Sequence, residues 1–409
     1  MLKKNCRMCK SQKLKVFLDL GFHAVSDGFL TKEQLDEAES MFPLRTCICT
    51  NCGLVQLDYV VPPDKLYREN YPYLSSITKT GQEHFHGMAA SICKKFDIPK
   101  GSLAIDIGSN IGVLLEGFKK CGMNVLGIDP ASNVAEMANK RGIETWPEYF
   151  DSKITKKVLA KKGKAAVITG TNVFAHIDDL DDCMHAVQEL LAKKGIFVFE
   201  LPYLVDLLEN LEYDTIYHEH LSYMSIKPLV SFFARFNMEV FDVERTTIHG
   251  GSIRVFVAGH GSYKRQKMVD ELVALEKEKK CYDLERLARF SGDVAKQKEE
   301  LIDLLRKLKK QGKRIVGLSA PAKGNTLLQY CKLGTDYLDY VTEKSETKIG
   351  LFTPGTHIPV VRDEEMLKDA PDYALLLAWN FAPEIIKNLE RYAKKGGKFI
   401  IPIPKPRVV

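Results

Sequence analysis

The sequence of 409 residues predicts an α/β protein with two parallel-sheet domains, the second smaller than the first. In two separate stretches, short apolar segments alternate with segments of helical periodicity, which is typical of a parallel sheet covered on both faces. A Lys- and Glu-rich stretch without proline, residues 264–311, separates them and predicts a helical connector. Two pairs of cysteines before the first stretch indicate a small additional domain at the N-terminus.

The first α/β stretch begins with an amphipathic helix, because Phe85, Met88 and Ile92 recur at helical spacing between residues 77 and 96. The aromatic residues 67–73 before it contain a proline, which favours a loop that crosses between domains. The remaining elements follow from apolar runs and their periodicity. We expect strands at 103–107, 124–128, 165–169 and 195–200, and helices at 113–120, 132–141 and 180–193.

Residues 264–311 are expected to form two bracing helices with solvated outer faces, divided at Ser291-Gly292-Asp293 because glycine and short polar residues favour helix ends. The second α/β stretch starts with an apolar strand over residues 314–320, followed by a loop of small residues and a helix that ends near Lys332. Further strands are expected near 338–342, 373–378 and 397–402.

The composition is that of an ordinary globular protein, with 45% hydrophobic and 27% charged residues. The 59 Lys+Arg and 53 Asp+Glu give a net charge of +6, which is too dilute to demand a nucleic-acid partner. Between the cysteine pairs, Glu33, Asp36 and Glu37 also have the wrong sign for a phosphate groove.

The sequence contains no membrane-spanning pattern. No apolar stretch approaches the roughly 18 to 20 residues that cross a bilayer, and the N-terminus has no apolar signal core. We therefore expect a cytoplasmic protein without a membrane partner, and a monomer or weak oligomer.

Four of the ten cysteines form two C-x-x-C pairs, Cys6 with Cys9 and Cys49 with Cys52. Each pair is a tight turn that directs two thiolates at one point, and two such turns provide the four sulfurs that tetrahedral zinc prefers. Because four thiolates leave no coordination position for water, the zinc is expected to stabilise the fold rather than to catalyse. Cys47 lies close by but lacks the required spacing.

A glycine-rich run over residues 104–113 places an acid at the end of a strand and glycines where the chain turns into a helix. The spacing Gly108-x-x-x-Gly112 is not the dinucleotide fingerprint, and Asp106 in front of it favours a cation over a phosphate. Asp129 ends the next strand about twenty residues on, where an acid can accept both ribose hydroxyls. The candidate cofactor residues here are Asp106, Gly108, Ser109, Asn110, Gly112 and Asp129.

This run resembles the class I methyltransferases, which use S-adenosylmethionine and carry a D-x-G-x-x-x-G motif followed by a strand-end acid. The resemblance implies a Rossmann-like domain in which Asp106 and Gly108 lie against the methionine end of the cofactor and Asp129 holds the ribose. It also implies that Asn172 and Val173, which follow the fourth strand, lie beside the cofactor.

The most unusual local sequence is Tyr217-His218-Glu219-His220, which lacks the i, i+4 histidines of a catalytic zinc helix. A histidine can take a proton at neutral pH, and a tyrosine hydroxyl can steady a developing oxyanion. His176 follows another strand of the first domain. We expect His176, His220, Glu219 and Tyr217 to lie near one edge of the sheet. This combination of side chains predicts a reacting site.

Several motifs then follow one another in order along the whole chain, and together they resemble a particular family, the sugar C-methyltransferases that act on nucleotide-linked 4-keto deoxysugars. The motifs are the paired C-x-x-C, Tyr71-Pro72-Tyr73-x-Ser75-Ser76, the cofactor run, Asn172-Val-Phe-Ala-His176, Tyr217-His-Glu-His220-Leu-Ser, His249-Gly-Gly-Ser252-Ile-Arg254 and Gly350-Leu-Phe-Thr-Pro354-Gly-Thr-His357-Ile-Pro359.

This second resemblance implies which residues act on the sugar. His220 is expected to be the base, surrounded by Tyr71, His176, Tyr217 and Glu219. The C-terminal half is expected to help hold the nucleotide diphosphate. Residues whose chemistry suits that task are Ser252, Arg254, Lys323 and Asn325.

The chemistry follows from the ketone. A C–H bond beside a 4-keto group can be broken because the enolate places its charge on oxygen. Carbon 3 therefore becomes a nucleophile once His220 has removed its proton. Two alternatives stay open: a methyltransferase that acts on nucleic acid or on a sugar oxygen, and a binding protein without catalysis. The expected domains are residues 1–70 for zinc, 71–262 for S-adenosylmethionine, 263–311 as the helical connector and 312–409 as a smaller Rossmann-like domain for the nucleotide sugar.

Overall fold

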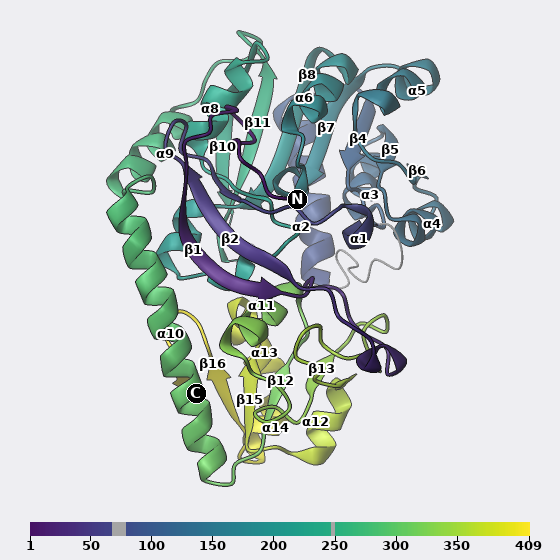
Figure 1. Ribbon diagram of the computed structural model, residues 1–409. Helices are drawn as coiled ribbons and strands as arrows, with labels where there is room; N and C mark the ends of the chain where they lie inside the picture. The colour runs from purple at the N-terminus through teal and green to yellow at the C-terminus, as the bar shows by residue number, and fades with distance from the viewer. Residues whose placement is uncertain (68–78, 247–249) are drawn as a thin grey trace.

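The computed structural model describes residues 1–67, 79–246 and 250–409, and these are drawn as solid ribbons and coils in Figure 1. Tyr71, which the family resemblance places near the sugar, lies outside the described residues. Within these ranges, every helix is too short or too polar to traverse a lipid bilayer. The described strands form three sheets, one for each predicted folded domain.

An antiparallel sheet of four strands forms the N-terminal domain. Its elements are β1 (Leu14–His23), η1 (Glu33–Asp36), β2 (Phe42–Cys49), β3 (Val55–Leu57), α1 (Asp64–Tyr67) and β9 (Ser222–Tyr223). The strand order is β1-β2-β3-β9, so the sheet is completed by a strand from far along the sequence. Val55 pairs with Tyr223 and Gln56 with Ser222. The segment that carries His220 therefore ends inside the N-terminal sheet.

A sheet of seven strands forms the first α/β domain. Its strands are β4 (Leu103–Ile107), β5 (Asn124–Ile128), β6 (Thr145–Trp146), β7 (Ala165–Thr171), β8 (Leu191–Pro202), β10 (Met238–Thr246) and β11 (Ser252–Gly259), in the order β10-β11-β8-β7-β4-β5-β6. The neighbours from β8 to β6 are all parallel, as the sequence predicts. β11 runs antiparallel to both β8 and β10, and this hairpin is not among the strands that the sequence predicts.

Helices cover both faces of this sheet. They are α2 (Lys79–Lys95), α3 (Val113–Lys120), α4 (Ser132–Lys140), α5 (Ser152–Lys162), η2 (Phe174–His176), α6 (Leu180–Leu190), α7 (Leu204–Glu209), η3 (Tyr213–Thr215) and α8 (Ile226–Ala234). Successive residues of one strand enter different apolar clusters: Ile105 of β4 packs into one cluster and Ala104 into another. This alternation confirms the prediction of a parallel sheet that is buried on both sides.

The helical connector consists of α9 (Lys267–Glu278) and α10 (Leu284–Lys310), and α10 runs along one side of the molecule between the two α/β domains (Figure 1). The prediction that Ser291-Gly292-Asp293 divides the helices is wrong, because α10 continues through all three. Phe290 and Val294 are fully buried on either side of them, so packing holds this turn helical despite its glycine. The break lies at 279–283, where Lys280 has a left-handed φ of 53°.

A sheet of six strands forms the C-terminal domain. Its elements are β12 (Ile315–Leu318), α11 (Ala322–Cys331), β13 (Val341–Glu343), β14 (Val360–Arg362), α12 (Asp363–Asp369), β15 (Tyr373–Leu376), η5 (Trp379–Phe381), α13 (Ala382–Asn388), α14 (Glu390–Lys394), β16 (Lys398–Ile401) and β17 (Arg407–Val408). The order is β14-β13-β12-β15-β16-β17, and only β17 runs antiparallel to its neighbour. The predicted second parallel domain is thereby confirmed.

Gln297 of α10 connects distant parts of the chain in the buried interior. Its Oε1 accepts a hydrogen bond from the Tyr213 hydroxyl at 2.6 Å, and its Nε2 donates to the Pro402 carbonyl at 2.8 Å. The side chain is only 2% exposed, so water cannot replace either bond. One amide group thus joins the first α/β domain, the connector and the C-terminal segment.

Replacing this amide by an apolar group should destabilise the fold. In Gln297→Leu, the Pro402 carbonyl loses its bond to Gln297 and the Tyr213 hydroxyl keeps the weaker contact with the Cys331 sulfur at 3.7 Å, and an unpaired buried polar group costs about 1–3 kcal/mol. We expect the free energy of unfolding, measured by urea denaturation, to fall by roughly 2 kcal/mol or more. As a control, Gln266→Leu removes an exposed hydrogen bond to the Lys264 carbonyl and should change it by less than about 0.5 kcal/mol. Equal stabilities of the two variants would contradict this account.

Candidate active site and zinc centre

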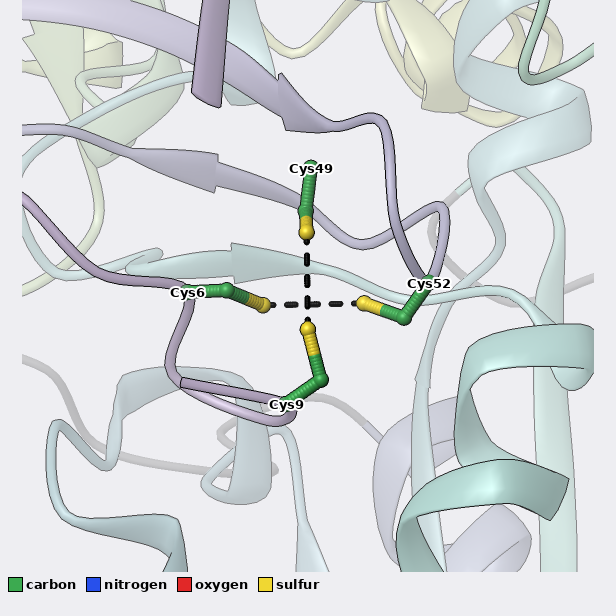
Figure 2. A group of neighbouring side chains, drawn as sticks. All are labelled: Cys6, Cys9, Cys49 and Cys52. Carbon is green, nitrogen blue, oxygen red and sulfur yellow. Dashed lines mark hydrogen bonds between the residues drawn. The ribbon is translucent and has the colours of Figure 1, made fainter. Parts of the chain in front are cut away.

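The four cysteines predicted to bind zinc come together in space. Figure 2 shows their sulfurs pointing toward one centre, Cys6 and Cys9 from the loop before β1, Cys49 from the end of β2 and Cys52 from the turn after it. All four Sγ atoms lie within 4.8 Å of one another, with 3.6 Å between Cys6 and Cys52 and 3.5 Å between Cys9 and Cys49. Zinc–sulfur bonds of about 2.3 Å in a tetrahedron separate sulfurs by roughly 3.8 Å. The cluster therefore fits a zinc ion.

The two cysteine turns share one backbone design. After the first pair, the Lys10 amide donates to the Cys6 carbonyl at 3.0 Å, and after the second, the Gly53 amide donates to the Cys49 carbonyl at 2.8 Å. Lys10 and Gly53 both have positive φ, 60° and 92°, which turns the chain back sharply after the second thiol. Cys47 is not part of the cluster, and burial raises the pKa of its thiol to about 12.

Arg7 attaches the first cysteine turn to the rest of the molecule. Its guanidinium donates to the Leu57 carbonyl of β3 at 2.7 Å and to Asp178, which follows η2, at 3.2 Å. Its backbone amide donates to the Gln56 side chain at 2.9 Å. Arg7 is only 4% exposed, so these bonds are shielded from solvent. The zinc centre is thus continuous with β3 and, through it, with β9.

The carboxyl edge of the seven-stranded sheet holds the predicted cofactor residues. Asp106, at the end of β4, is buried and accepts a hydrogen bond from Thr169 at 2.6 Å, and burial raises the pKa of its carboxyl to about 7. Asp129, after β5, accepts backbone N–H bonds from Asn110 at 2.8 Å and from Ala131 at 2.9 Å. Backbone amides therefore fix the direction of the Asp129 carboxylate.

Two glycines of the cofactor run are required by close contacts. Gly108 has φ +62°, and a Cβ there would lie 2.4 Å from the Val173 side chain. Gly112 has φ +78°, and a Cβ there would lie 2.7 Å from Ile143. The contact also shows that Val173 stands directly against the cofactor run. The remaining residues of the group, Ser109, Asn110 and Asn172, lie in the same loops, the last two with left-handed φ of 48° and 56°.

Both ring nitrogens of His220 have a hydrogen-bond partner among the described residues. Nδ1 lies 2.8 Å from the Thr215 carbonyl, and Nε2 lies 2.7 Å from the Tyr217 hydroxyl. Because a carbonyl can only accept, Nδ1 carries a proton, and in the neutral ring Nε2 carries the lone pair and accepts from Tyr217. The second predicted histidine, His176, has its ring centroid 5.0 Å from that of His220. The structure therefore brings these three predicted residues together.

His176 is held as a neutral ring. Burial, followed by the nearby His220, lowers the pKa of His176 well below its usual value. Its Nδ1 lies 3.4 Å from the hydroxyl of Tyr67, and the two rings are stacked with centroids 6.1 Å apart. Tyr67 is not among the residues that the sequence analysis singles out. Its position at the start of the aromatic run 67–73 is the signal that points to it.

The two residues before His220 have different surroundings. Glu219 is buried, and its charge adds to the burial that raises the pKa of Tyr67. His218 instead packs edge-on against Phe42 of β2 with ring centroids 5.9 Å apart, and burial lowers the pKa of its imidazole to about 4. His218 thus belongs to the contact with the N-terminal sheet.

The four residues suggested for the diphosphate fall into two groups. Ser252 and Arg254 lie on β11, where the Arg254 guanidinium bonds to Glu200 at 2.7 Å and to Glu244 at 3.2 Å. Lys323 and Asn325 lie in the first turn of α11. The Lys323 ammonium sits 4.3 Å from the Trp379 ring centroid and 3.8 Å from Asp214, and the Asn325 amide donates to the Ser26 carbonyl at 2.6 Å.

Loss of the zinc ion should destabilise the N-terminal sheet. We expect Cys49→Ala to lose the single zinc ion per chain, measured by inductively coupled plasma mass spectrometry, and to lower the melting temperature, because binding energy of a structural zinc is folding energy. Cys47→Ala, on the same strand but outside the cluster, should keep one zinc. Full zinc content in Cys49→Ala would contradict the assignment of the ligands.

Comparisons with known proteins agree with this arrangement along the whole chain. Residues 6–67 match a family model described as "Putative zinc binding domain", residues 83–243 one described as "Methyltransferase domain", and residues 247–404 one described as "C-methyltransferase C-terminal domain". The chain is 35% identical over 405 residues to the C-methyltransferase NovU of Streptomyces niveus, which covers 99% of this chain and 96% of the relative.

Two further proteins share only part of the chain. The Ubiquinone biosynthesis O-methyltransferase of Colwellia psychrerythraea is 31% identical over 97 residues, 23% of this chain and 39% of its own length. A solved S-adenosylmethionine-dependent methyltransferase of Clostridium acetobutylicum is 16% identical, with a TM-score of 0.35, over 44% of this chain and 92% of its own. Because the match to NovU spans nearly the full length of both proteins, this chain belongs to the S-adenosylmethionine-dependent C-methyltransferase family, and its N-terminal domain is the zinc-binding domain of that family.

Proposed function

We propose that this enzyme methylates carbon 3 of a nucleotide-linked 4-keto deoxysugar, with His220 as the base that removes the proton from that carbon. The observation that carries the proposal is the hydrogen bond from His220 Nδ1 to the Thr215 carbonyl, 2.8 Å long. It leaves the lone pair on Nε2, the atom that a base needs. Family resemblance along the chain supplies the class of substrate.

The proton moves from carbon 3 to Nε2 of His220, and the electron pair it leaves behind is delocalised onto the ketone oxygen as an enolate. In the absence of substrate, Nε2 holds the Tyr217 hydroxyl at 2.7 Å. We infer that the sugar displaces this hydroxyl, which then donates to the enolate oxygen. A positioned general base contributes roughly 10²- to 10⁴-fold in rate. His176 stays neutral and, with Tyr67, Tyr71 and Glu219, surrounds the sugar in this proposal.

The cofactor site is assigned to the carboxyl edge of β4, β5 and β7. Asp129 is proposed to hold the ribose hydroxyls, and Asp106 with Gly108 to border the methionine end, together with Ser109, Asn110, Gly112, Asn172 and Val173. The close approach of Gly108 and Val173 supports this, because only a residue without Cβ leaves room there. When bound, S-adenosylmethionine supplies an electrophilic methyl group to the carbon that His220 has deprotonated.

The nucleotide diphosphate is assigned to the start of α11, where Lys323 provides a positive charge and Asn325 an amide. The Lys323 ammonium lies 3.8 Å from Asp214 in the segment that carries His220, which supports a site shared between the two α/β domains, and Asn325 is buried two residues further along α11. Ser252 and Arg254 are kept in this proposal as a second group. A diphosphate contact by Arg254 requires that its guanidinium leave Glu244, since Glu200 and Glu244 engage it now.

Replacement of the proposed base should lower turnover strongly and leave the affinity for the methyl donor unchanged. We expect His220→Ala to lower kcat by about 10²- to 10⁴-fold, followed as gain of one methylene by mass spectrometry with a panel of 4-keto sugar nucleotides. The Kd for S-adenosylmethionine, from calorimetry, should stay within about threefold because no cofactor residue changes. His260→Ala, at an exposed histidine, is the control with unchanged turnover. Full turnover in His220→Ala would refute the base.

Loss of the ribose acid should have the opposite pattern. Charge-assisted hydrogen bonds are worth about 1.5–3 kcal/mol, so Asp129→Ala should raise the Kd for S-adenosylmethionine about 10- to 100-fold. At saturating cofactor, kcat should fall far less than in His220→Ala. An unchanged Kd in a variant whose circular dichroism spectrum matches the parent would remove Asp129 from the cofactor site.

A further inference from the structure

The segment from Tyr213 to Leu221 is anchored from several domains. At its start, the Tyr213 hydroxyl bonds to Gln297 of the connector at 2.6 Å. At its end, the Leu221 carbonyl accepts from the Leu57 amide of the N-terminal domain at 2.9 Å. His220 directly precedes Leu221. The segment therefore does not hold His220 through contacts within the first α/β domain alone.

The C-terminal domain contacts the segment on both sides of Thr215, whose carbonyl holds His220. On one side, Asp214 is fully buried and accepts a hydrogen bond from Trp379 Nε1 of η5 at 2.7 Å. On the other, the Ile216 carbonyl accepts from the Thr326 hydroxyl of α11 at 3.1 Å. The two residues that flank Thr215 are thus tied to the C-terminal domain. Within the segment, the Ile216 amide, which shares a peptide group with the Thr215 carbonyl, donates to the Tyr213 carbonyl at 3.0 Å.

We propose that Thr326 and the pair of Asp214 with Trp379 are positioning residues for His220: they fix the Thr215 carbonyl, which selects the Nδ1–H tautomer and leaves Nε2 as the base. The inference rests on the proposed function of His220. None of the three is assigned to contact the sugar or the cofactor. Thr326 is 0% exposed, so its hydroxyl acts only on the chain around it.

The physical reason is that the tautomer of a neutral imidazole is set by what its other nitrogen bonds. If the Thr215 carbonyl turns away, the Nδ1–H group loses its hydrogen-bond acceptor. The Nδ1–H tautomer is then less favoured, and the fraction of rings with a lone pair on Nε2 falls. The ring also loses its orientation, and small misplacements of a reacting group can cost up to about 100-fold in rate. Both effects lower kcat without weakening substrate binding.

Two conservative variants test this in the full-length, zinc-loaded enzyme. Thr326→Val keeps the shape of the side chain and removes its hydroxyl, and Trp379→Phe keeps an aromatic ring and removes its N–H. Thr155→Val is the matched control, because Thr155 is also buried and its hydroxyl bonds locally, to the Ser152 carbonyl within α5 at 2.8 Å. Each protein is examined by steady-state kinetics and by ¹⁵N NMR of labelled histidine, with the His220 signals assigned by their loss in His220→Gln.

We expect parent and Thr155→Val to show His220 with Nδ1 protonated and Nε2 unprotonated. Thr326→Val should lower kcat about tenfold, leave KM for the sugar nucleotide within about twofold, and shift the His220 ¹⁵N signals toward mixed tautomers. Trp379→Phe should lower kcat and shift the His220 signals in the same direction, so both effects are still tested if either variant fails to fold. KM is read from Thr326→Val, because the Lys323 ammonium lies 4.3 Å from the Trp379 ring centroid.

Three outcomes would overturn the inference. The first is an unchanged kcat with unchanged His220 signals in both variants, and the second is a raised KM with unchanged kcat, which would indicate substrate binding instead. The third is a lowered kcat with His220 signals like those of the parent. In each case a low turnover of His220→Ala leaves the proposed function intact, whereas full turnover of His220→Ala removes the base itself and the inference with it.

Discussion

The hydrogen bond from His220 Nδ1 to the Thr215 carbonyl is the interaction on which the proposed chemistry depends. A neutral imidazole acts as a base only through the nitrogen that lacks a proton, and this bond decides which nitrogen that is. The neighbouring His176 is kept neutral by burial, so no second positive charge opposes protonation of His220 during turnover. The bond to Thr215 therefore orients the ring, and the neutral His176 adds no positive charge beside it.

The domains of the chain meet around this one segment. The zinc centre orders the turn before β3, β3 pairs with β9, and β9 begins two residues after His220. The connector holds Tyr213 and the C-terminal domain holds Asp214 and Ile216. In the proposed mechanism, a metal site without a position for water can thus still matter for catalysis, because it belongs to the framework that holds the proposed base.

Local sequence patterns account for much of this architecture and less of the site. Each cysteine turn and the run from Asp106 to Gly112 could be predicted because each is formed by a few consecutive residues. Asp129 could be placed near the run because it ends the neighbouring parallel strand. The pairing of β3 with β9, the antiparallel β11 and the contact of Thr326 with Ile216 join residues far apart in sequence, and no local pattern encodes them. At Ser291-Gly292-Asp293, burial of Phe290 and Val294 outweighs the preference of glycine for a helix end.

The most direct test of the base is proton exchange at the sugar carbon without methyl transfer. The enzyme is incubated in D₂O with a 4-keto sugar nucleotide and S-adenosylhomocysteine in place of the methyl donor, and deuterium in the recovered sugar is measured by mass spectrometry. The account predicts that the parent enzyme exchanges the hydrogen on carbon 3 for deuterium and that His220→Ala does not exceed the enzyme-free rate. Equal exchange by the two proteins would contradict it.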